Sequence, residues 1–319
     1  MNPAAREEEA VEAEARGRAT PVSGAAFVTG GAGFAGGYLL ELLPGATAPS
    51  RDELELLDAA AVRAAVRDTE PETVWHLAAL ASVGRSWEAP AETIAENVTM
   101  TANLLEAVRR EAPAATVVLI SSGEVYGPPE RLPVDEQAPL RPQNPYAVSK
   151  AACDLLGGQY ADATGLSVVR LRPFNHTGPG QGDDYVVGTL TRQVAEAEAA
   201  GLEEAVVQTG NPDSARDFSD VRDVVRAYVA AARLEPGAYN VASGRAVSVR
   251  DLIELVRAAA RIPVRHEVDP ARVRAHDVPE VRASAQRLHE ATGWAPQIPL
   301  EQTVADTLDA WRRALGAAR

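Results

Sequence analysis

The sequence has little of what marks secreted, membrane-spanning or nucleic-acid-binding proteins. It contains one cysteine, Cys153, so no intramolecular disulfide can form, which fits a reducing compartment. No apolar run approaches the roughly 18–20 residues of a membrane-spanning helix, and the N-terminal region shows no signal peptide. The net charge of −14 argues against a nucleic-acid binder, which would carry a basic patch. These absences predict a cytoplasmic protein with no membrane or nucleic-acid partner.

Aromatic residues and metal-binding clusters are also scarce. Aromatic residues make up 5% of the 319 positions, so Ala, Val and Leu must fill the core. No grouping of His, Cys or carboxylate residues has the spacing of metal ligands, so we expect no metal site. Residues 1–22 are charged and Ala-rich without a packing face, which predicts a disordered acidic tail.

Strand-like and helix-like segments alternate along most of the chain. The short apolar runs with strand character are "AAFVTG", "LELL", "TVWHLAA", "TVVLISS" and "LSVVRLRP", and longer amphipathic stretches follow them. This alternation predicts an α/β fold with a doubly wound parallel sheet, the Rossmann arrangement. A Gly/Pro-rich loop begins near Phe174 and breaks the pattern, so a smaller C-terminal substrate domain is expected, interleaved with the first.

The expected domain boundaries follow this change of pattern. Residues 23–173 are expected to form the dinucleotide-binding domain, and residues 217–245 to return to it. Residues 174–216 and 246–319 are then expected to form the substrate-binding domain.

Three glycines between a strand and a helix predict a phosphate-binding loop. The segment "TGGAGFAG" contains Gly30, Gly33 and Gly36, a spacing that permits a tight turn and lets a diphosphate approach a helix N-terminus. Farther on, Ser50 and Arg51 stand near the place where NAD-selective folds often carry an acid, and they would suit a 2′-phosphate. We therefore favour NADP(H), with NAD(H) possible if Arg51 only faces water.

The segment "NPYAVSK" carries a candidate proton donor and its partner. Tyr146 and Lys150 are four residues apart, so they share one face of a helix. Asn144 suits the N-cap of that helix and Pro145 its first position. An ammonium group beside a phenol favours the phenolate, so Lys150 is expected to lower the pKa of Tyr146. Such a tyrosine can exchange a proton with a substrate near neutral pH.

Five motifs together resemble one family. "TGGAGFAG", "WHLAA", "SSGEVYG", "NPYAVSK" and "RPFNHTGPGQ" occur in the order found in extended short-chain dehydrogenase/reductases, the NAD-dependent epimerase/dehydratase family that acts on nucleotide sugars. The resemblance covers nearly everything from residue 24 onward. It implies that Ser122 is the catalytic hydroxyl, that Tyr146 is the acid/base, and that Lys150 supports it and holds the nicotinamide ribose. The further cofactor contacts that it implies are Phe34, Ala35, Glu55, Leu77, Ala78, Ala79 and Pro173.

The loop "FNHTGPGQ" resembles the one shared by GDP-mannose 4,6-dehydratases and GDP-4-dehydro-6-deoxymannose reductases, and its neighbouring segments are more similar to the reductases. By this resemblance Arg216 and Arg274 would neutralise the sugar-nucleotide diphosphate, since guanidinium groups bind phosphate oxygens bidentately. A solvated salt bridge is the alternative for each arginine. The other substrate contacts implied are Ser82, Glu124, Asn175 and His176, the last of which could instead orient the loop.

The motifs predict an oxidoreductase. The leading hypothesis is NADPH-dependent reduction of the C4 ketone of a GDP- or dTDP-linked 4-keto-6-deoxyhexose in deoxysugar biosynthesis. The alternative is a 4,6-dehydratase or 4-epimerase that keeps NAD(P) tightly bound. A silent NADP-sensing protein of this fold would typically have lost the tyrosine or the lysine, and both are present. A homodimer is expected, for which the Ala-rich stretch from Ala151 is either a contact surface or core.

The segment "SSGEVYG" favours reduction over dehydration. Removing water across C5 and C6 requires a base and an acid, and related dehydratases carry three polar side chains in this segment. Here Gly123 has no side chain between Ser122 and Glu124. Ketone reduction needs only Ser122 and Tyr146, so the gap does not affect it. Glu124 then either binds a sugar hydroxyl or caps local backbone.

Overall fold

The computed structural model describes residues 24–273 and 278–317 of the chain. Its largest sheet is parallel throughout, with the strand order β1-β2-β3-β4-β8. These strands are β1 (Ala26–Thr29), β2 (Thr73–His76), β3 (Thr116–Ile120), β4 (Ser167–Pro173) and β8 (Gly237–Val241). Helices follow these parallel strands, so the predicted doubly wound α/β fold is confirmed.

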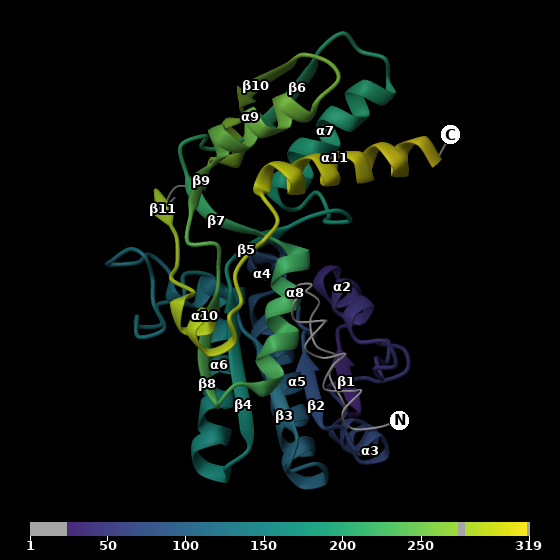
Figure 1. The fold of residues 1–319 in the computed structure, drawn as a ribbon, viewed down its shortest axis with the longest axis vertical. Coiled ribbons are helices and arrows are strands. Elements are labelled where there is room, and N and C mark those ends of the chain that lie inside the picture. Colours follow the sequence, from purple (N-terminus) through teal and green to yellow (C-terminus); the bar gives the residue numbers. More distant parts are fainter. Residues whose placement is uncertain (1–23, 274–277, 318–319) are drawn as a thin grey trace, which may run out of the picture.

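Helices cover both faces of this sheet (Figure 1). One face carries α2 (Phe34–Leu42), α8 (Val221–Ala230) and α10 (Gln286–Thr292). The other face carries α3 (Ala59–Thr69), α5 (Pro90–Glu111) and α6 (Pro145–Thr164). Asp58 caps α3 and Asn144 caps α6, and Pro145 takes the first position of α6, as their sequence patterns predict. No helix in the described ranges is both long and apolar enough to cross a membrane.

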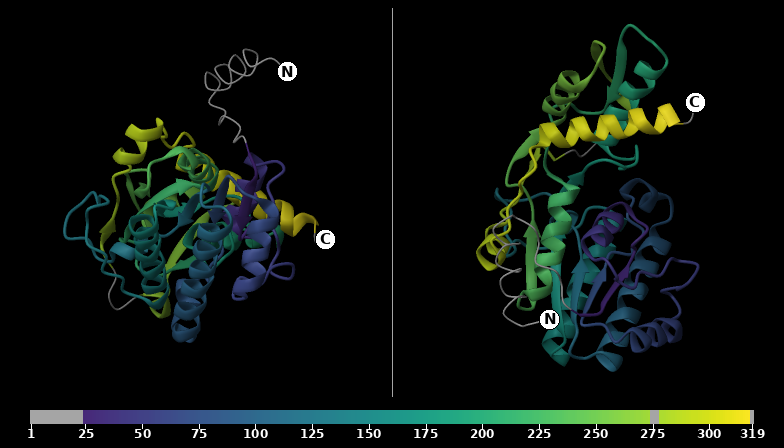
Figure 2. Two further views of the ribbon diagram at one scale, coloured as in Figure 1. Left: turned by 90° about the horizontal axis from the view of Figure 1, so that it is seen from below. Right: turned by 45° about the vertical axis from the view of Figure 1, so that its right-hand side comes forward.

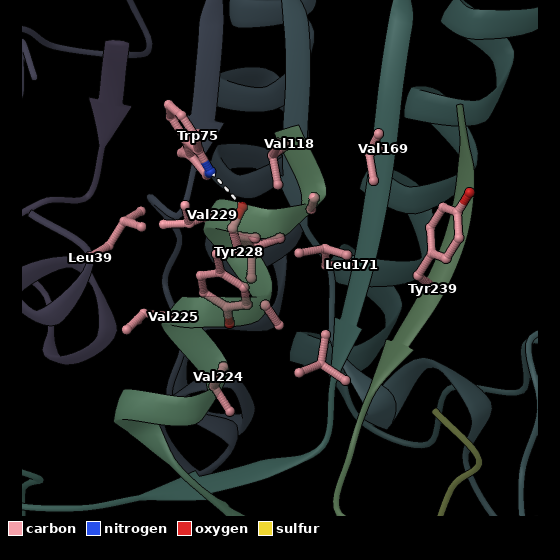
Figure 3. Packing of buried hydrophobic residues seen from close by; sticks show 14 of the residues in the cluster. Leu39, Trp75, Val118, Val169, Leu171, Val224, Val225, Tyr228, Val229 and Tyr239 are labelled. Atoms are coloured by element: carbon pink, nitrogen blue, oxygen red, sulfur yellow. Dashed lines mark hydrogen bonds between the residues drawn. The ribbon is translucent and has the colours of Figure 1, made fainter. Parts of the chain in front are cut away.

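Alternation along the strands explains why both faces are apolar. Val28 and Trp75 point to the α2 and α8 side, whereas their neighbours Phe27 and Val74 point to the α3 and α5 side. Figure 3 shows Trp75 beside α8, where the indole nitrogen donates a hydrogen bond to the Tyr228 carbonyl oxygen at 2.8 Å. This bond satisfies a polar group inside an apolar core that also contains Tyr228, Tyr239 and Trp294.

A second layer lies beyond the C-terminal ends of the large sheet (Figures 1 and 2). The chain enters this layer after β4 and returns to the large sheet through α8 and β8. It enters the second layer again at β9. Its strands are β5 (Asn175–Thr177), β6 (Ala205–Thr209), β7 (Ala215–Asp220), β9 (Ala246–Ser248), β10 (Val264–Val268) and β11 (Glu280–Val281). Its helices are α7 (Val186–Ala199), α9 (Val249–Ala259) and α11 (Leu300–Ala317), which enclose a separate apolar core. Short helices elsewhere are α4 (Val83–Glu88), η1 (Gly123–Tyr126), η2 (Ala231–Arg233) and η3 (Pro270–Arg272).

The strand predicted at "LELL" is wrong. Leu54 and Leu56 are buried at 7% exposure each, but the backbone there turns: the Leu54 amide bonds back to the Ser50 carbonyl oxygen at 3.0 Å. The leucines pack on the α3 side of the sheet without a partner strand. Upstream, Thr47 forms an isolated parallel bridge with Phe27. The chain therefore leaves β1 first to one side and then, through α3, to β2 on the other, which places a crevice at the C-terminal end of β1.

Candidate active site

The glycine loop after β1 fits the diphosphate of a dinucleotide. Gly30 has a φ of +76°, and a Cβ there would lie 2.6 Å from the Ala78 amide nitrogen. A Cβ on Gly36 would lie 2.1 Å from the Gly30 carbonyl oxygen. Gly33, the N-cap of α2, provides no capping side chain, and the first turn carries no acid. The helix N-terminus is therefore left to an anion, next to Phe34 and Ala35 in the first turn of α2.

Ser50 and Arg51, the residues predicted to bind the cofactor 2′-phosphate, lie in the turn that follows the Thr47 bridge. The Ser50 amide and hydroxyl both donate to Glu53 Oε2, at 2.8 and 2.9 Å. Arg51 is 71% exposed in its side chain, and its Nε lies 3.7 Å from Glu55 Oε2. Glu53 was missed in the sequence analysis, although an acid three residues after a serine is a common turn pattern. Ser50 is thus already bonded to a carboxylate, whereas the Arg51 guanidinium faces solvent.

The loop after β2 contains the three predicted cofactor contacts Leu77, Ala78 and Ala79. Leu80, the residue after Ala79, is held by Asn97 of α5, because the Leu80 amide donates to Asn97 Oδ1 at 2.7 Å. Asn97 Nδ2 in turn donates to Ser149 Oγ at 2.8 Å, in the α6 turn that carries the tyrosine and lysine. Asn97 is 2% exposed and was missed in the sequence analysis. A buried amide inside an amphipathic helix was the available signal, since such groups must find partners.

Ser122, Tyr146 and Lys150 come together at the C-terminal ends of β3 and β4. Ser122 follows β3 and lies beside the Tyr146 phenol. The Ser122 hydroxyl also accepts from the Glu124 amide at 3.2 Å. Lys150 is 6% exposed, and its Nζ donates to the Ile120 carbonyl oxygen at 2.6 Å. Ser122 thus lies beside the Tyr146 phenol, while Lys150 is held at the end of β3 by the Ile120 carbonyl oxygen.

The expected lowering of the Tyr146 pKa is wrong for this structure. Burial raises the pKa of Tyr146 above its ordinary value, and the Ser122 hydrogen bond opposes this only in part. Burial also lowers the pKa of Lys150. Both shifts arise because a buried site disfavours the charged form of each group. Tyr146 is therefore a neutral phenol, which is the form that donates a proton.

His76 has a structural place beneath this site. Its Nδ1 lies 2.7 Å from Thr29 Oγ1 and its Nε2 lies 3.1 Å from Thr101 Oγ1. Burial, and then the Lys150 charge, lower the pKa of His76 to about 3. A neutral ring with both nitrogens bonded ties β1, β2 and α5 together and leaves no free basic atom. In the described ranges no group of three or more His, Cys, Asp or Glu side chains could hold a metal ion.

The glycine at position 123 faces an aromatic ring. A Cβ on Gly123 would lie 2.9 to 3.0 Å from three ring carbons of Phe174. Phe174 is 7% exposed and stacks on Tyr126, with ring centroids 6.1 Å apart. The position of Tyr126 is fixed in turn by Arg172, whose Nη1 donates to the Tyr126 hydroxyl at 2.8 Å. The ring thus occupies the space that a middle polar side chain would need.

Adding a methyl group at this position is expected to destabilise the fold. Gly123→Ala should lower the free energy of unfolding by about 1–3 kcal/mol, because the Phe174 ring or the η1 turn must move to admit a Cβ. Urea unfolding would measure it. Gly316→Ala in α11 is the matched control, since nothing lies within 4 Å of a Cβ there. That variant should unfold at the same or slightly higher urea concentration. Equal behaviour of the two variants would contradict the prediction.

The two predicted substrate contacts in β5 have different surroundings. Asn175 is exposed at the start of β5. His176 stacks on Phe34 of α2, with ring centroids 6.1 Å apart and planes inclined by 2°. The His176 Nδ1 lies 3.3 Å from the Phe174 carbonyl oxygen, and burial lowers the pKa of His176. His176 thus lies against the phosphate-loop helix, closer to the predicted cofactor contacts than its sequence context indicated.

The remaining predicted contacts lie around the crevice. Ser82 caps α4 by accepting from the Arg85 amide at 3.3 Å, and Pro173 ends β4. Glu124 Oε2 accepts from Asn144 Nδ2 at 3.2 Å, beside Tyr146. The Glu124 carboxylate is therefore bonded to a side chain at the start of α6 rather than to its local backbone.

Of the two predicted phosphate-binding arginines, the structure describes Arg216, which belongs to the second layer. Arg216 is in β7, and its Nη1 donates to the carbonyl oxygens of Ala215 and Val278 at 2.8 and 2.7 Å. These bonds orient the guanidinium beside the Val278 backbone. Arg274 lies outside the described residues.

The chain is similar to known nucleotide-sugar enzymes. Residues 51–307 match the family model described as GDP-mannose 4,6 dehydratase. GDP-6-deoxy-D-mannose reductase of Pseudomonas aeruginosa is 39% identical over 297 residues, covering 89% of this chain and 96% of that protein. The solved structure of RMD from the same organism, complexed with NADPH, has a TM-score of 0.82 at 36% identity and covers 92% of this chain and 100% of that one. UDP-glucose 4-epimerase of Thermus thermophilus, solved with NAD, has a TM-score of 0.79 at 32% identity, with coverages of 91% and 99%.

Proposed function

The chain belongs to the GDP-mannose 4,6-dehydratase family, and from this membership we propose that it is an NADPH-dependent nucleotide-sugar 4-ketoreductase. Its substrate is the C4 ketone of a GDP- or dTDP-linked 4-keto-6-deoxyhexose, an intermediate of deoxysugar biosynthesis. The similarity to a GDP-6-deoxy-D-mannose reductase and to an NADPH complex supports reduction with NADP(H). The observation that carries the proposal is the Ser122–Tyr146 pair beside a Gly123 whose side-chain space Phe174 fills.

Ser122, Tyr146 and Lys150 each have a separate role in the proposed reaction. The bound cofactor supplies a hydride to the ketone carbon. Ser122 and Tyr146 hydrogen-bond the ketone oxygen, and Tyr146 donates its proton as the alkoxide develops. Because burial keeps Tyr146 protonated, this donor is ready before the substrate arrives. Lys150 holds the nicotinamide ribose and places a positive charge beside the phenolate that remains.

The cofactor is held along the crevice from β1 to β4. The loop with Gly30, Gly33 and Gly36 cradles its diphosphate at the α2 N-terminus. The loop after β2 and the end of β4 contact the remainder of the cofactor. On the substrate side, Arg216 and Arg274 neutralise the diphosphate of the sugar nucleotide, while Asn175 contacts the sugar.

An NADPH-consumption assay tests the proposal. GDP- and dTDP-linked 4-keto-6-deoxyhexoses are supplied in turn, and NADPH absorbance is followed while the product is identified by NMR. Stoichiometric loss of NADPH with one substrate is the expected result. No consumption with any of them refutes the reductase.

A 4,6-dehydratase or 4-epimerase with tightly bound NAD(P) is the second candidate. It is favoured by Glu124, a carboxylate that lies beside Tyr146 and is available for proton removal. Such an enzyme recycles its hydride, so it converts sugar nucleotides without net NADPH use. It also releases cofactor only on denaturation, which a nucleotide assay of the heat-treated protein detects.

Arg51 is proposed to select NADP(H) by binding the 2′-phosphate. Arg51→Ala should raise the NADPH dissociation constant by about tenfold or more, because a charge-assisted bond is lost, and should leave NADH binding unchanged. Fluorescence titration with both nucleotides measures this. Arg67→Ala, an exposed arginine paired with Asp68, is the control. Equal losses for NADPH and NADH would reject the role.

A homodimer is proposed to form through α6. Val148 and Leu155 lie seven residues apart on this helix and are 38% and 61% exposed, so they form an uncovered apolar stripe. Leu155→Glu should convert the dimer into a monomer, because each copy would place a carboxylate in the same symmetric contact. Light scattering after size-exclusion chromatography measures the mass. Leu202→Glu, the same change at a 53% exposed leucine outside α6, should remain a dimer, and a dimeric Leu155→Glu would rule out this surface.

The proposed location is the cytoplasm. Cys153 is a free, buried thiol, which suits a reducing compartment. The nucleotide-sugar substrate and the NADPH pool are also cytoplasmic. No membrane or nucleic-acid partner is proposed.

A further inference from the structure

One buried hydroxyl beside the active site has no partner within the described part of the protein. Ser121 is 2% exposed, and its Oγ makes no hydrogen bond to any described residue. An unpaired buried hydroxyl has lost its hydration without compensation, so folding alone would be better served by alanine. The presence of a hydroxyl here therefore points to a role in ligand binding.

The backbone geometry places this hydroxyl on the α6 side of the sheet. The Ser121 amide donates to the Leu171 carbonyl oxygen at 2.8 Å, which continues the β3–β4 ladder by one residue. Alternation along the strand then puts Ser121 on the same face as Leu119. Leu119 packs on α6, where a Cβ on Gly157 would come within 2.7 Å of it.

Lys150 lies at the same point of the sheet. Its Nζ donates to the carbonyl oxygen of Ile120, the residue that precedes Ser121, at 2.6 Å. Both side chains are buried at the C-terminal end of β3. An ammonium group has three donors, so the carbonyl bond leaves Lys150 able to bind more.

The neighbouring polar groups are already bonded to one another. Asn97 binds Ser149 and Leu80, while Thr101 binds His76 and the Cys153 sulfur, the latter at 3.2 Å. These groups therefore do not need Ser121. Ser121 is therefore the polar side chain of this cluster that is left without a partner among the described residues.

We propose that Ser121 is a cofactor-binding residue whose hydroxyl, beside Lys150, binds the ribose on the nicotinamide half of the dinucleotide. A vicinal diol suits this pair because each ribose hydroxyl both donates and accepts. The inference rests on the proposed use of NADPH. It does not depend on which sugar is reduced.

Ser121→Ala tests the inference with two measurements: the variant should bind NADPH more weakly, yet should be more stable in the absence of nucleotide. The NADPH dissociation constant, from fluorescence titration, should rise about fivefold because one hydrogen bond is lost. The melting temperature of the protein without nucleotide should rise by about 1–3 °C, since a buried unpaired hydroxyl is removed. The affinity for 2′,5′-ADP, which lacks the nicotinamide ribose, should not change.

Ser167→Ala is the matched control. Ser167 begins β4 at the opposite end of the sheet, and its hydroxyl accepts from Thr116 Oγ1 at 3.3 Å. This variant should leave the affinities for NADPH and 2′,5′-ADP unchanged and should not gain thermal stability.

Other results overturn the inference. Unchanged NADPH affinity in Ser121→Ala would do so, as would an equal loss for NADPH and 2′,5′-ADP. If the unmodified chain binds NADPH but reduces no 4-keto sugar, the proposed function fails while the Ser121 measurement stands. If the unmodified chain binds no NADPH, both proposals fail together.

Discussion

Tyr146→Phe is expected to lower kcat for 4-keto sugar reduction by about 10²–10⁴-fold, because the variant loses the general acid that protonates the developing alkoxide. The NADPH dissociation constant should stay close to that of the unmodified protein, since the lost hydroxyl faces the ketone rather than the ribose. Ser122 would keep one hydrogen bond to the ketone oxygen, so KM should change far less than kcat. Steady-state kinetics and nucleotide titration separate the two effects.

The pH dependence follows from the direction of the Tyr146 shift. Burial raises the pKa of the phenol, so Tyr146 stays protonated through neutral pH and reduction should not lose rate there for want of this proton. The rate limit from Tyr146 should appear only at alkaline pH, above the ordinary pKa of tyrosine. That limb should be absent from the residual activity of Tyr146→Phe.

Tyr160→Phe provides the control on the same helix. Tyr160 Oη donates to Glu106 Oε2 at 3.4 Å on the surface between α5 and α6, away from the catalytic group. This variant should keep full kcat. If Tyr146→Phe also kept full turnover, the proton would come from another group, and the role assigned to Tyr146 would be rejected.

Much of the fold could be predicted because its signals are local. Asn144 caps α6 and Pro145 begins it, as predicted, and the apolar runs of β1 to β4 are strands. The prediction at "LELL" is wrong because two buried leucines satisfy a strand pattern whether or not a neighbouring strand supplies hydrogen bonds. Burial can be read from periodicity, but pairing requires a partner that is distant in sequence.

In the site, too, features set by neighbouring residues could be predicted, whereas features set by residues distant in sequence could not. The spacing of Tyr146 and Lys150 placed both on α6, yet the direction of the Tyr146 pKa shift depends on burial by segments far along the chain. The role of Gly123 changed in the same way, since Phe174 lies 51 residues away in sequence and fills its side-chain space. Asn97 was missed because its partners, Leu80 and Ser149, are also remote.

Asp154→Ala is expected to cause the largest loss of stability, about 3–5 kcal/mol in the free energy of unfolding. Asp154 is fully buried on α6 and receives two bonds from Arg172, each 2.8 Å long, and one from Arg170 at 3.3 Å. Removing the carboxylate leaves the Arg172 guanidinium, 5% exposed, without its counter-charge. Urea unfolding should show the shift. Asp162→Ala, an exposed carboxylate on the same helix, should change the free energy by less than about 0.5 kcal/mol.

The Asp154–Arg172 ion pair also supports Tyr126 and, through it, Phe174, so its loss should affect activity as well as stability. Arg172 also donates to the Tyr126 hydroxyl, which donates to Asn240 Oδ1 at 2.7 Å, and Tyr126 stacks on Phe174. Burial raises the pKa of Tyr126 to about 12, so this bond persists across the working range of pH. Replacing the pair with apolar residues, as in Asp154→Leu with Arg172→Met, should recover much of the stability, since no buried charge remains unpaired. It should not recover kcat, because Phe174, against Gly123 and next to Asn175, would lose the support that holds it. Full activity in the double variant would mean that the ion pair serves stability alone.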